Sequence, residues 1–343
     1  MESQDFELNQ ETFGEEINFS TETVIPKTVI EKKNIKNEGK KAGLTLIIIE
    51  IISFAWSFIA LYVMLLMGYS QQDFFNLFQN PAVEQITQIV ISTLMFTLPF
   101  ILTYKLSGDK ISSLIGNKKC GFKTCFPLYL LGVAFCAYTN IITSLAGAIF
   151  ESAGINYEVD MGQNPKGIFG FLLSVIATAV VPALVEEFAC RGIVLGSLKR
   201  FGEGFALIAS SLIFGLMHGN FQQIPFAFFV GLALGFVTLK TGNLWTAVII
   251  HGTNNFVSVL MDYIFVGKLS RYATISYNIY LFVALFVGII AIFLLRKQDA
   301  NFFSLKKSDT ESGEVKKQVW LFTSAPILIF VVITIIQSMR YFN

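Results

Sequence analysis

Residues 167–198 read GIFGFLLSVIATAVVPALVEEFACRGIVLGSL, and this stretch decides the fold class. It exceeds the roughly 20 apolar residues that a helix needs to cross the hydrocarbon core of a bilayer. Its only charged residues are Glu186, Glu187 and Arg191. An ionisable side chain at membrane depth costs at least about 2.5 kcal/mol. Three of them so close together are therefore expected to serve a site.

The composition of the whole chain agrees with this interpretation. Hydrophobic residues make up 54% of the chain and charged residues only 14%, and there are 35 phenylalanines. Soluble domains carry about 25% charged residues. A chain of this kind is expected to be a polytopic membrane protein built from helices, because helices satisfy their own backbone hydrogen bonds in lipid. The net charge of +1 gives no indication of a nucleic-acid partner.

Nine apolar stretches approach or reach membrane-spanning length. They lie near residues 43–67, 88–106, 126–150, 167–198, 204–220, 221–239, 244–266, 275–295 and 319–339. The polar insert at 296–317 is too short to form a second domain. The sequence therefore predicts an all-α bundle of about nine transmembrane helices over residues 42–343, with a catalytic core at about 167–266.

The N-terminal segment differs from the rest in its charge. Its first 26 residues hold seven Asp or Glu and no Lys or Arg, the reverse of the basic start of a signal peptide. Six lysines follow between residues 27 and 41. On composition we expect residues 1–41 to form a disordered, solvated tail; a regulatory tail is the alternative.

The basic residues also predict how the chain is oriented in the cell membrane. A cytoplasmic N-terminus puts 20 of the 25 Lys and Arg on the cytoplasmic side and four on the other. Because short cytoplasmic segments are enriched in Lys and Arg, this bias predicts a cytoplasmic N-terminus and an extracytoplasmic C-terminus.

The four cysteines show no metal-binding or redox pattern. Cys120 and Cys125 fall in a short polar loop, and Cys136 and Cys190 fall in predicted helices. Since neither Cys-x-x-Cys nor a zinc-knuckle spacing occurs, we expect all four to be free thiols.

The two histidines of the chain both lie in apolar stretches. Glu186 precedes the turn near residues 200–202 by about 21 Å of helix, and His218 follows it by about 24 Å. The two side chains can therefore lie at a similar depth. His251 lies about 12 Å beyond the next turn, at residues 241–243.

Helical spacing groups the remaining polar residues. His251 and Asn255 share a face because they are four residues apart, as do Glu187 and Arg191. Glu187 and Arg191 can neutralise each other, which leaves Glu186 free to face a water molecule. Taken singly, such a pair is often structural, and a membrane histidine is often a helix–helix hydrogen-bond partner. Glu50, alone in the first stretch, is assigned no role.

In order and spacing, three motifs resemble the CPBP family, the CAAX proteases and bacteriocin-processing enzymes also called the Abi or type II CAAX endopeptidase family. They are Glu186-Glu187-Phe188-Ala189-Cys190-Arg191, Phe214-Gly215-Leu216-Met217-His218 and His251-Gly252-Thr253-Asn254-Asn255. The match covers about residues 170–262, so substrate choice is not transferable from it.

The resemblance implies an intramembrane endopeptidase that cleaves a membrane-associated peptide or a lipidated protein. Glu186 and His218 would activate water, and His251 and Asn255 would stabilise the oxyanion. Glu187, Arg191 and Phe214 would support them, with Arg191 also a candidate anchor for a substrate carboxylate.

The sequence leaves two questions open: whether a metal is bound, and whether the protein is a protease. Glu186, His218 and His251 could bind zinc and leave a position for water, or activate water without a metal. Neither His-Glu-x-x-His nor Gly-x-Ser-x-Gly occurs. The alternatives to a protease are a non-proteolytic scaffold or bacteriocin-immunity protein that retains the motifs, and a transporter with a buried proton-coupling cluster.

Overall fold

The computed structural model describes residues 26–154, 164–265 and 270–342. Its helices, in chain order, are α1 (Lys27–Leu66), α2 (Gln71–Phe78), α3 (Pro81–Leu106), α4 (Ile111–Leu114), α5 (Phe122–Ser152), α6 (Gly167–Ser174), α7 (Val181–Glu187), α8 (Leu195–Leu198), α9 (Glu203–Leu216), α10 (Gln223–Thr241), α11 (Leu244–Phe265), α12 (Ser270–Gln298), α13 (Glu314–Phe322) and α14 (Ala325–Met339). The described residues form no strand beyond one isolated bridge between Asn117 and Asn243. The predicted all-α class is confirmed.

Seven helices are long and apolar enough to cross a membrane, and the pair α13–α14, bent by 74°, passes the same test as one unit. The apolar helix α9, with 14 residues, is shorter. These nine units correspond one to one to the nine predicted stretches, so the chain is a multi-pass membrane protein. The fourth unit, from Gly167 to Phe201, is continuous but contains two π-helical segments.

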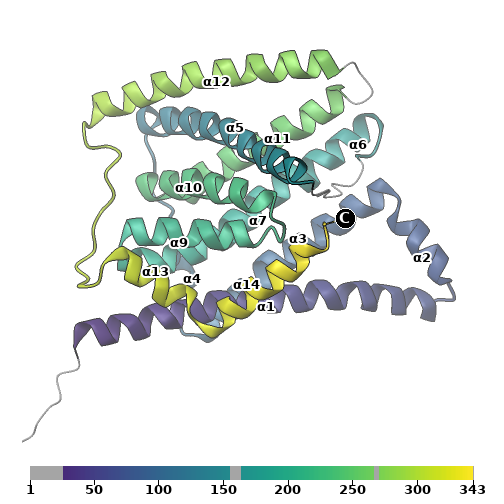
Figure 1. Cartoon of the computed structure of the whole chain (residues 1–343), viewed down its shortest axis with the longest axis horizontal. Coiled ribbons are helices and arrows are strands. Elements are labelled where there is room, and N and C mark those ends of the chain that lie inside the picture. The colour runs from purple at the N-terminus through teal and green to yellow at the C-terminus, as the bar shows by residue number, and fades with distance from the viewer. Residues whose placement is uncertain (1–25, 155–163, 266–269, 343) are drawn as a thin grey trace, which may run out of the picture.

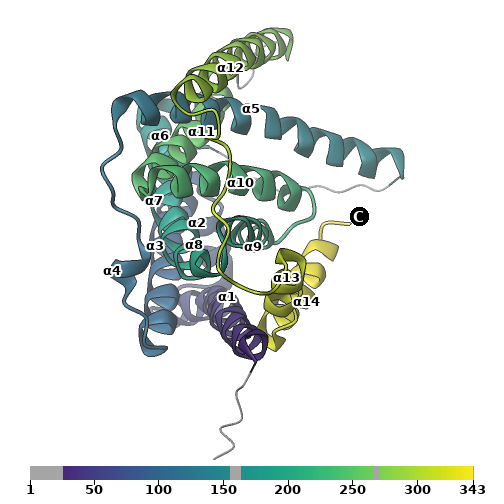
Figure 2. The same ribbon diagram turned by 90° about the vertical axis from the view of Figure 1, so that its left-hand side faces the viewer.

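The helices form two layers. In the first, α12 packs on α5, α5 on α10, and α10 on α9, and this order is visible from top to bottom in Figure 1. In the second, α7 lies between α11 and α3, beside the first layer in the view of Figure 2. The bent pair α13–α14 packs along α1 at the opposite end from α12. The three motifs therefore lie on α7, α9 and α11, inside the bundle.

The first part of α1 corrects the predicted tail. Residues 1–25 lie outside the described residues, but α1 begins at Lys27, so residues 27–41 are helical. Ion pairs hold this segment on the bundle: the buried Glu38 carboxylate pairs with Arg200 at 2.6 Å and with Lys41 at 2.7 Å. A composition-based prediction misses the pair with Arg200 because the two residues are remote in sequence.

Close backbone contact joins α1 to α14. A Cβ atom added at Gly43 would lie 2.4 Å from the backbone nitrogen of Ile327, a distance that no side chain tolerates. The absence of a side chain at Gly43 therefore lets the two helices touch, as small residues do at membrane helix interfaces.

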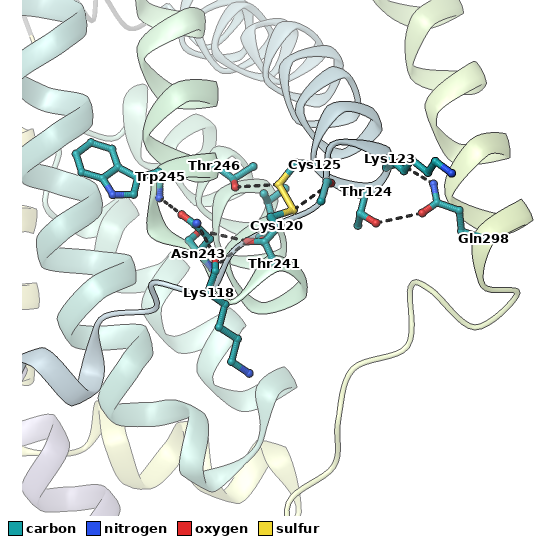
Figure 3. Close-up of a disulfide and its surroundings, with 12 residues drawn as sticks. Lys118, Cys120, Lys123, Thr124, Cys125, Thr241, Asn243, Trp245, Thr246 and Gln298 are labelled. Atoms are coloured by element: carbon teal, nitrogen blue, oxygen red, sulfur yellow. Dashed lines mark hydrogen bonds between the residues drawn. A yellow bond between two sulfur atoms is a disulfide. The ribbon is translucent and has the colours of Figure 1, made fainter.

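The prediction of four free thiols is wrong for two of them. Cys120 and Cys125 form a disulfide with a Cα–Cα distance of 5.9 Å, as Figure 3 shows. The turn that begins α5 brings their backbones together, which motif spacing does not reveal. Cys136 and Cys190 are free and buried, as predicted.

Candidate functional site

The Glu187 carboxylate is the centre of the site. Its Oε1 atom accepts one hydrogen bond from Arg191 Nη1 at 2.8 Å and another from His251 Nδ1 at 2.9 Å. All three side chains are buried, with exposed fractions of 0%, 1% and 5%. The predicted Glu187–Arg191 pair is thus present, and the carboxylate also orients a histidine from a different helix.

Arg191 is held by three contacts with its surroundings. Besides Glu187, its Nη2 atom donates to the backbone carbonyl of Gly231 on α10 at 3.3 Å. Its guanidinium also lies over the ring of Phe214, 4.2 Å from the ring centre. A buried guanidinium needs such compensation because an unpaired charge in the bundle would be costly. The residue joins α10 and α9 to the helix that carries both glutamates.

Phe214 contacts both histidines. Its ring centre lies 5.0 Å from that of His218 and 6.0 Å from that of His251, edge-to-face in both cases. Phe214 is 2% exposed. Because one rigid ring touches Arg191 and both imidazoles, it sets the distance between the two histidines. The structure therefore brings together His218, His251, Arg191 and Phe214.

His218 lies just beyond the end of α9 and is only partly buried. Its Nδ1 atom lies 2.9 Å from the carbonyl oxygen of Phe214. Since a carbonyl only accepts, Nδ1 must carry the proton, and in the neutral ring Nε2 then holds a free lone pair. The His218 ring is thus oriented by the backbone and has Nε2 available as a proton acceptor.

The turn after His218 is tied to α14. Ser338 Oγ donates to the carbonyl oxygen of Gly219 at 3.1 Å, and the amide of Asn220 donates to the His218 carbonyl. The neighbouring residue Gln337 bonds Glu50 at 2.5 Å. Glu50 therefore makes a helix–helix contact rather than standing alone.

Glu186 differs from its neighbour Glu187. It is partly buried, and its carboxylate makes no hydrogen bond or ion pair with any described residue. The charge of the Glu186 carboxylate interacts with the His218 side chain, as do the side chains of His251 and Arg191. A carboxylate that has no protein partner and lies beside a histidine is suited to bind and deprotonate water.

Asn255, on α11, is held by a backbone carbonyl of the helix that carries the glutamates. Its Nδ2 atom donates to the carbonyl oxygen of Thr178 at 3.0 Å, and its Oδ1 atom accepts from Asn254 at 3.2 Å. Pro182 has no N–H to offer the Thr178 carbonyl four residues earlier, which leaves that oxygen available. The amide has a second N–H that neither bond uses.

Two π-helical segments flank the glutamates and were not predicted. They span Val175–Val180 and Phe188–Val194, on either side of α7. Single π-turns inside helices frequently occur at functional sites, because the wider turn re-aims side chains. Pro182 is the one sequence signal that could have indicated the first segment; the second has no such signal.

The arrangement of the described side chains bears on whether the site could hold a metal ion. Among the residues that the structure describes, no three or more His, Cys, Asp and Glu side chains are grouped so that they could hold a metal ion. The predicted donor set of Glu186, His218 and His251 is therefore not grouped as a metal site, and the reaction proposed for the protein uses its side chains alone.

Comparison with known proteins links this geometry to a family. Residues 168–257, which contain all three motifs, match the family model of the Rce1-like type II CAAX prenyl endopeptidases. No solved structure matches the chain.

Two bacterial membrane proteins are similar to the chain. One, of Bacillus subtilis (strain 168), is named "Putative membrane peptidase YdiL"; it is 28% identical over 124 residues, which cover 34% of this chain and only 50% of that protein. The other, of Staphylococcus aureus (strain USA300), is the membrane-embedded CAAX protease MroQ; it is 25% identical over 209 residues, which cover 57% of this chain and 81% of that protein. The predicted family resemblance is therefore confirmed: residues 168–257 of this multi-pass membrane protein match the Rce1-like domain of the type II CAAX prenyl endopeptidases.

Proposed function

We propose that the protein is an intramembrane endopeptidase that hydrolyses a membrane-associated peptide or a lipidated protein, with water activated by Glu186 and His218. The observation that carries the proposal is the unequal pairing of the two adjacent carboxylates. Glu187 is fully buried and bonded to Arg191 and His251, whereas Glu186 is partly buried and bonded to no described residue. Of the two carboxylates, Glu186 is the one that is both partly exposed and without a protein partner, so we assign it as the base.

The proposed reaction begins with a water molecule bound between Glu186 and His218 Nε2. Glu186 takes a proton from the water molecule while the water oxygen attacks the carbonyl carbon of the scissile peptide bond. The carbonyl π electrons move to oxygen and form a tetrahedral oxyanion. On collapse the C–N bond breaks, and the proton held by Glu186 passes to the leaving amine. His218 orients the water through Nε2, which its hydrogen bond to Phe214 leaves unprotonated.

His251 and Asn255 stabilise the oxyanion in this scheme. His251 Nδ1 is bonded to Glu187, so the ring offers a donor to the oxyanion only when Nε2 is also protonated. Because Glu187 is already paired with Arg191, the developing oxyanion itself supplies the negative charge that pairs with the imidazolium. Asn255 contributes its second amide N–H, since the first is bonded to Thr178. Donors fixed in advance in a water-poor site stabilise developing charge at little reorganisation cost.

Substrate identification tests this proposal. Membrane fractions of a wild-type strain and of a Glu186→Gln strain would be compared by peptidomics, with Glu151→Gln at the exposed end of α5 as the control. We expect at least one peptide to disappear only in the Glu186→Gln strain, with its uncleaved precursor accumulating. Purified wild-type protein should then cut that precursor. Identical peptidomes, or cleavage by the Glu186→Gln protein, would refute the proposal.

The orientation of the chain remains part of the proposal. The basic bias supports a cytoplasmic N-terminus, and nine spans would then place the C-terminus outside. Topology reporters fused after Gly313 and after Asn343 should give opposite locations. The same location for both would mean that α13–α14, bent by 74°, enters and leaves on one side.

The disulfide supplies an independent test of this orientation. It lies in a segment that the basic bias places in the cytoplasm, where thiols are normally kept reduced. With this orientation the cytoplasm should keep open the bond that the structure shows, so that in intact cells Cys120 and Cys125 react with permeant alkylating reagents. A bond that is fully formed in cells would argue for the opposite orientation.

A further inference from the structure

Glu50 is the only Asp, Glu, Lys or Arg in the apolar stretch at residues 43–67, and the proposed reaction does not use it. Such a residue type is costly at membrane depth, and where it occurs it usually has a function. Glu50 is partly buried on α1. Its Oε2 atom accepts a hydrogen bond from Gln337 Nε2 at 2.5 Å, the only hydrogen bond of this carboxylate to a described residue. Glu50 therefore holds a side chain near the end of α14.

The end of α14 contacts the turn that follows His218. Ser338 Oγ donates to the carbonyl oxygen of Gly219 at 3.1 Å. A Cβ atom added at Gly219 would lie 3.3 Å from Gln337 Oε1, so the Gln337 carboxamide lies close to the backbone of the same glycine. Two consecutive side chains of α14 thus reach the residue directly after His218.

This turn determines where the His218 imidazole lies. The helix α9 ends at Leu216, and Gly219 has a φ of 67°, a left-handed conformation that glycine adopts without steric cost. The backbone nitrogen of His218 donates to Gly215, and that of Gly219 donates to Leu216. Because His218 lies in a tight turn beyond the helix, a shift of the turn moves its ring. A misplacement of about 1 Å in a reacting group can cost about 100-fold in rate.

Contacts between α1 and α14 occur in the same order along both helices. The backbones touch at Gly43 and Ile327. Glu50 lies about two helical turns beyond Gly43, and its partner Gln337 lies about three turns beyond Ile327. The two helices therefore run in the same direction, as Figure 1 shows. Backbone contact fixes the start of α14, and the polar pair fixes the end that reaches Gly219.

Both helices lie outside the part of the chain that matches the family model. The match covers residues 168–257, which include His218, whereas α1 ends at Leu66 and α14 begins at Ala325. Contacts with the turn after His218 thus come from a part of the chain beyond the matched domain.

We propose that Glu50 is a positioning residue for His218. Its hydrogen bond to Gln337 holds the last turn of α14 against Gly219 and thereby keeps the His218 ring where it can share a water molecule with Glu186. The inference rests on the proposed endopeptidase function and adds to it a determinant that does not touch the substrate.

Kinetics with an identified precursor test this link. Glu50→Leu and Gln337→Leu each remove the same hydrogen bond, so each should lower kcat by about two- to tenfold. KM should keep its wild-type value, because the displaced group acts on water. Glu50→Gln retains an acceptor oxygen for Gln337 and should restore the wild-type kcat.

The matched control is a second glutamine of the bent pair α13–α14. Gln318 Nε2 donates to the carbonyl oxygen of Phe205 at 3.0 Å, at the opposite end of α9 from His218. Gln318→Leu also removes one hydrogen bond between helices and should leave kcat unchanged. The double variant Glu50→Leu with Gln337→Leu should lose no more kcat than either single variant, because both act through one bond.

A spectroscopic measurement tests the positioning without any substrate. The chain has two histidines. Full-length protein without a histidine tag, labelled with heavy nitrogen in its histidines, therefore gives NMR signals from two imidazoles, and His218→Gln assigns them. We expect Glu50→Leu and Gln337→Leu to shift the His218 signals and not those of His251. Glu50→Gln and Gln318→Leu should shift neither.

Several outcomes would overturn the positioning role. These are a wild-type kcat in both single leucine variants, unshifted His218 signals in both, losses that multiply in the double variant, or a loss in Glu50→Gln equal to that in Glu50→Leu. A lower melting temperature with wild-type kcat would show that the pair only stabilises the bundle. If the wild-type protein cleaves nothing while the His218 signals respond as expected, the endopeptidase function alone is contradicted.

Discussion

The two sides of the candidate site are built in opposite ways. On one side, Glu187, Arg191 and His251 are buried and hydrogen-bonded to one another. On the other, Glu186 and His218 are partly buried, and the only bond from either side chain goes to a backbone carbonyl. Adjacent glutamates of identical chemistry therefore have different environments. A carboxylate that is paired with Arg191 and bonded to His251 is suited to a positioning role, whereas a carboxylate without a partner remains available for reaction.

The largest expected effect comes from removing the unpaired carboxylate. Glu186→Gln keeps the size of the side chain but abolishes the base, so turnover of an identified precursor should fall by about 10²–10⁴-fold. The melting temperature should stay at the wild-type value, because no hydrogen bond to a described residue is lost. Turnover and thermal unfolding of the purified protein measure the two quantities.

Removing the paired carboxylate, Glu187, should instead lower the stability of the protein. Glu187→Gln leaves Arg191 buried without a counter-ion, which typically costs about 3–5 kcal/mol of stability. Combining it with Arg191→Met removes the orphan charge and should restore part of the loss. Thermal unfolding of the single and double variants checks this. If Glu187→Gln is stable but inactive and Glu186→Gln retains turnover, the base has been assigned to the wrong glutamate.

A smaller effect is expected from the ring that separates the two sides. Phe214→Leu keeps an apolar side chain but removes the cation–π contact with Arg191, which is worth about 2 kcal/mol when desolvated. Both imidazoles also lose their edge-to-face neighbour, so turnover should fall together with stability. Phe205→Leu, at a buried position of the same helix without a contact to the site, is the matched control. Equal losses of turnover in both variants would show that Phe214 is ordinary packing.

The smallest effect should come from the link to α14. Ser338→Ala removes one hydrogen bond to the turn after His218, at a cost of about 1 kcal/mol. If this link positions His218, kcat should drop measurably while KM stays constant. Thr334→Ala, one helical turn earlier, loses a bond within α14 only and serves as the control. Unchanged kcat in Ser338→Ala would assign α14 a purely structural role.

Much of this architecture could be predicted from the sequence, because its determinants are local. Hydrophobic run length locates the nine apolar units, and the i, i+4 spacing locates the Glu187–Arg191 pair. What escaped prediction depends on partners remote in the chain. The carbonyl oxygens that hold Asn255 and Arg191 come from Thr178 and Gly231, and backbone acceptors leave no trace in a motif.

The wrong expectations have the same origin. Residues 27–41 looked like a solvated tail because their lysines and glutamates could not be matched to Arg200 and Lys317 in advance. Cys120 and Cys125 looked free because only their spacing was considered, not the turn that brings them together. The bond of His251 to Glu187 on another helix was not part of any expectation and could not be read from spacing.

The π-helical segments on either side of α7 make the site sensitive to chain length rather than to residue type. An α-helical turn takes 3.6 residues and each residue turns the helix by about 100°, so one residue more or fewer redirects everything that follows. Deleting one residue from Phe188–Val194 would let the segment relax to a regular helix, which keeps α8 close to its present direction but changes which residues inside the segment, Arg191 included, face Glu187. The segment between Glu187 and Lys199 therefore has a fixed length as well as a sequence, and homologous proteins should vary there by substitution and not by insertion or deletion.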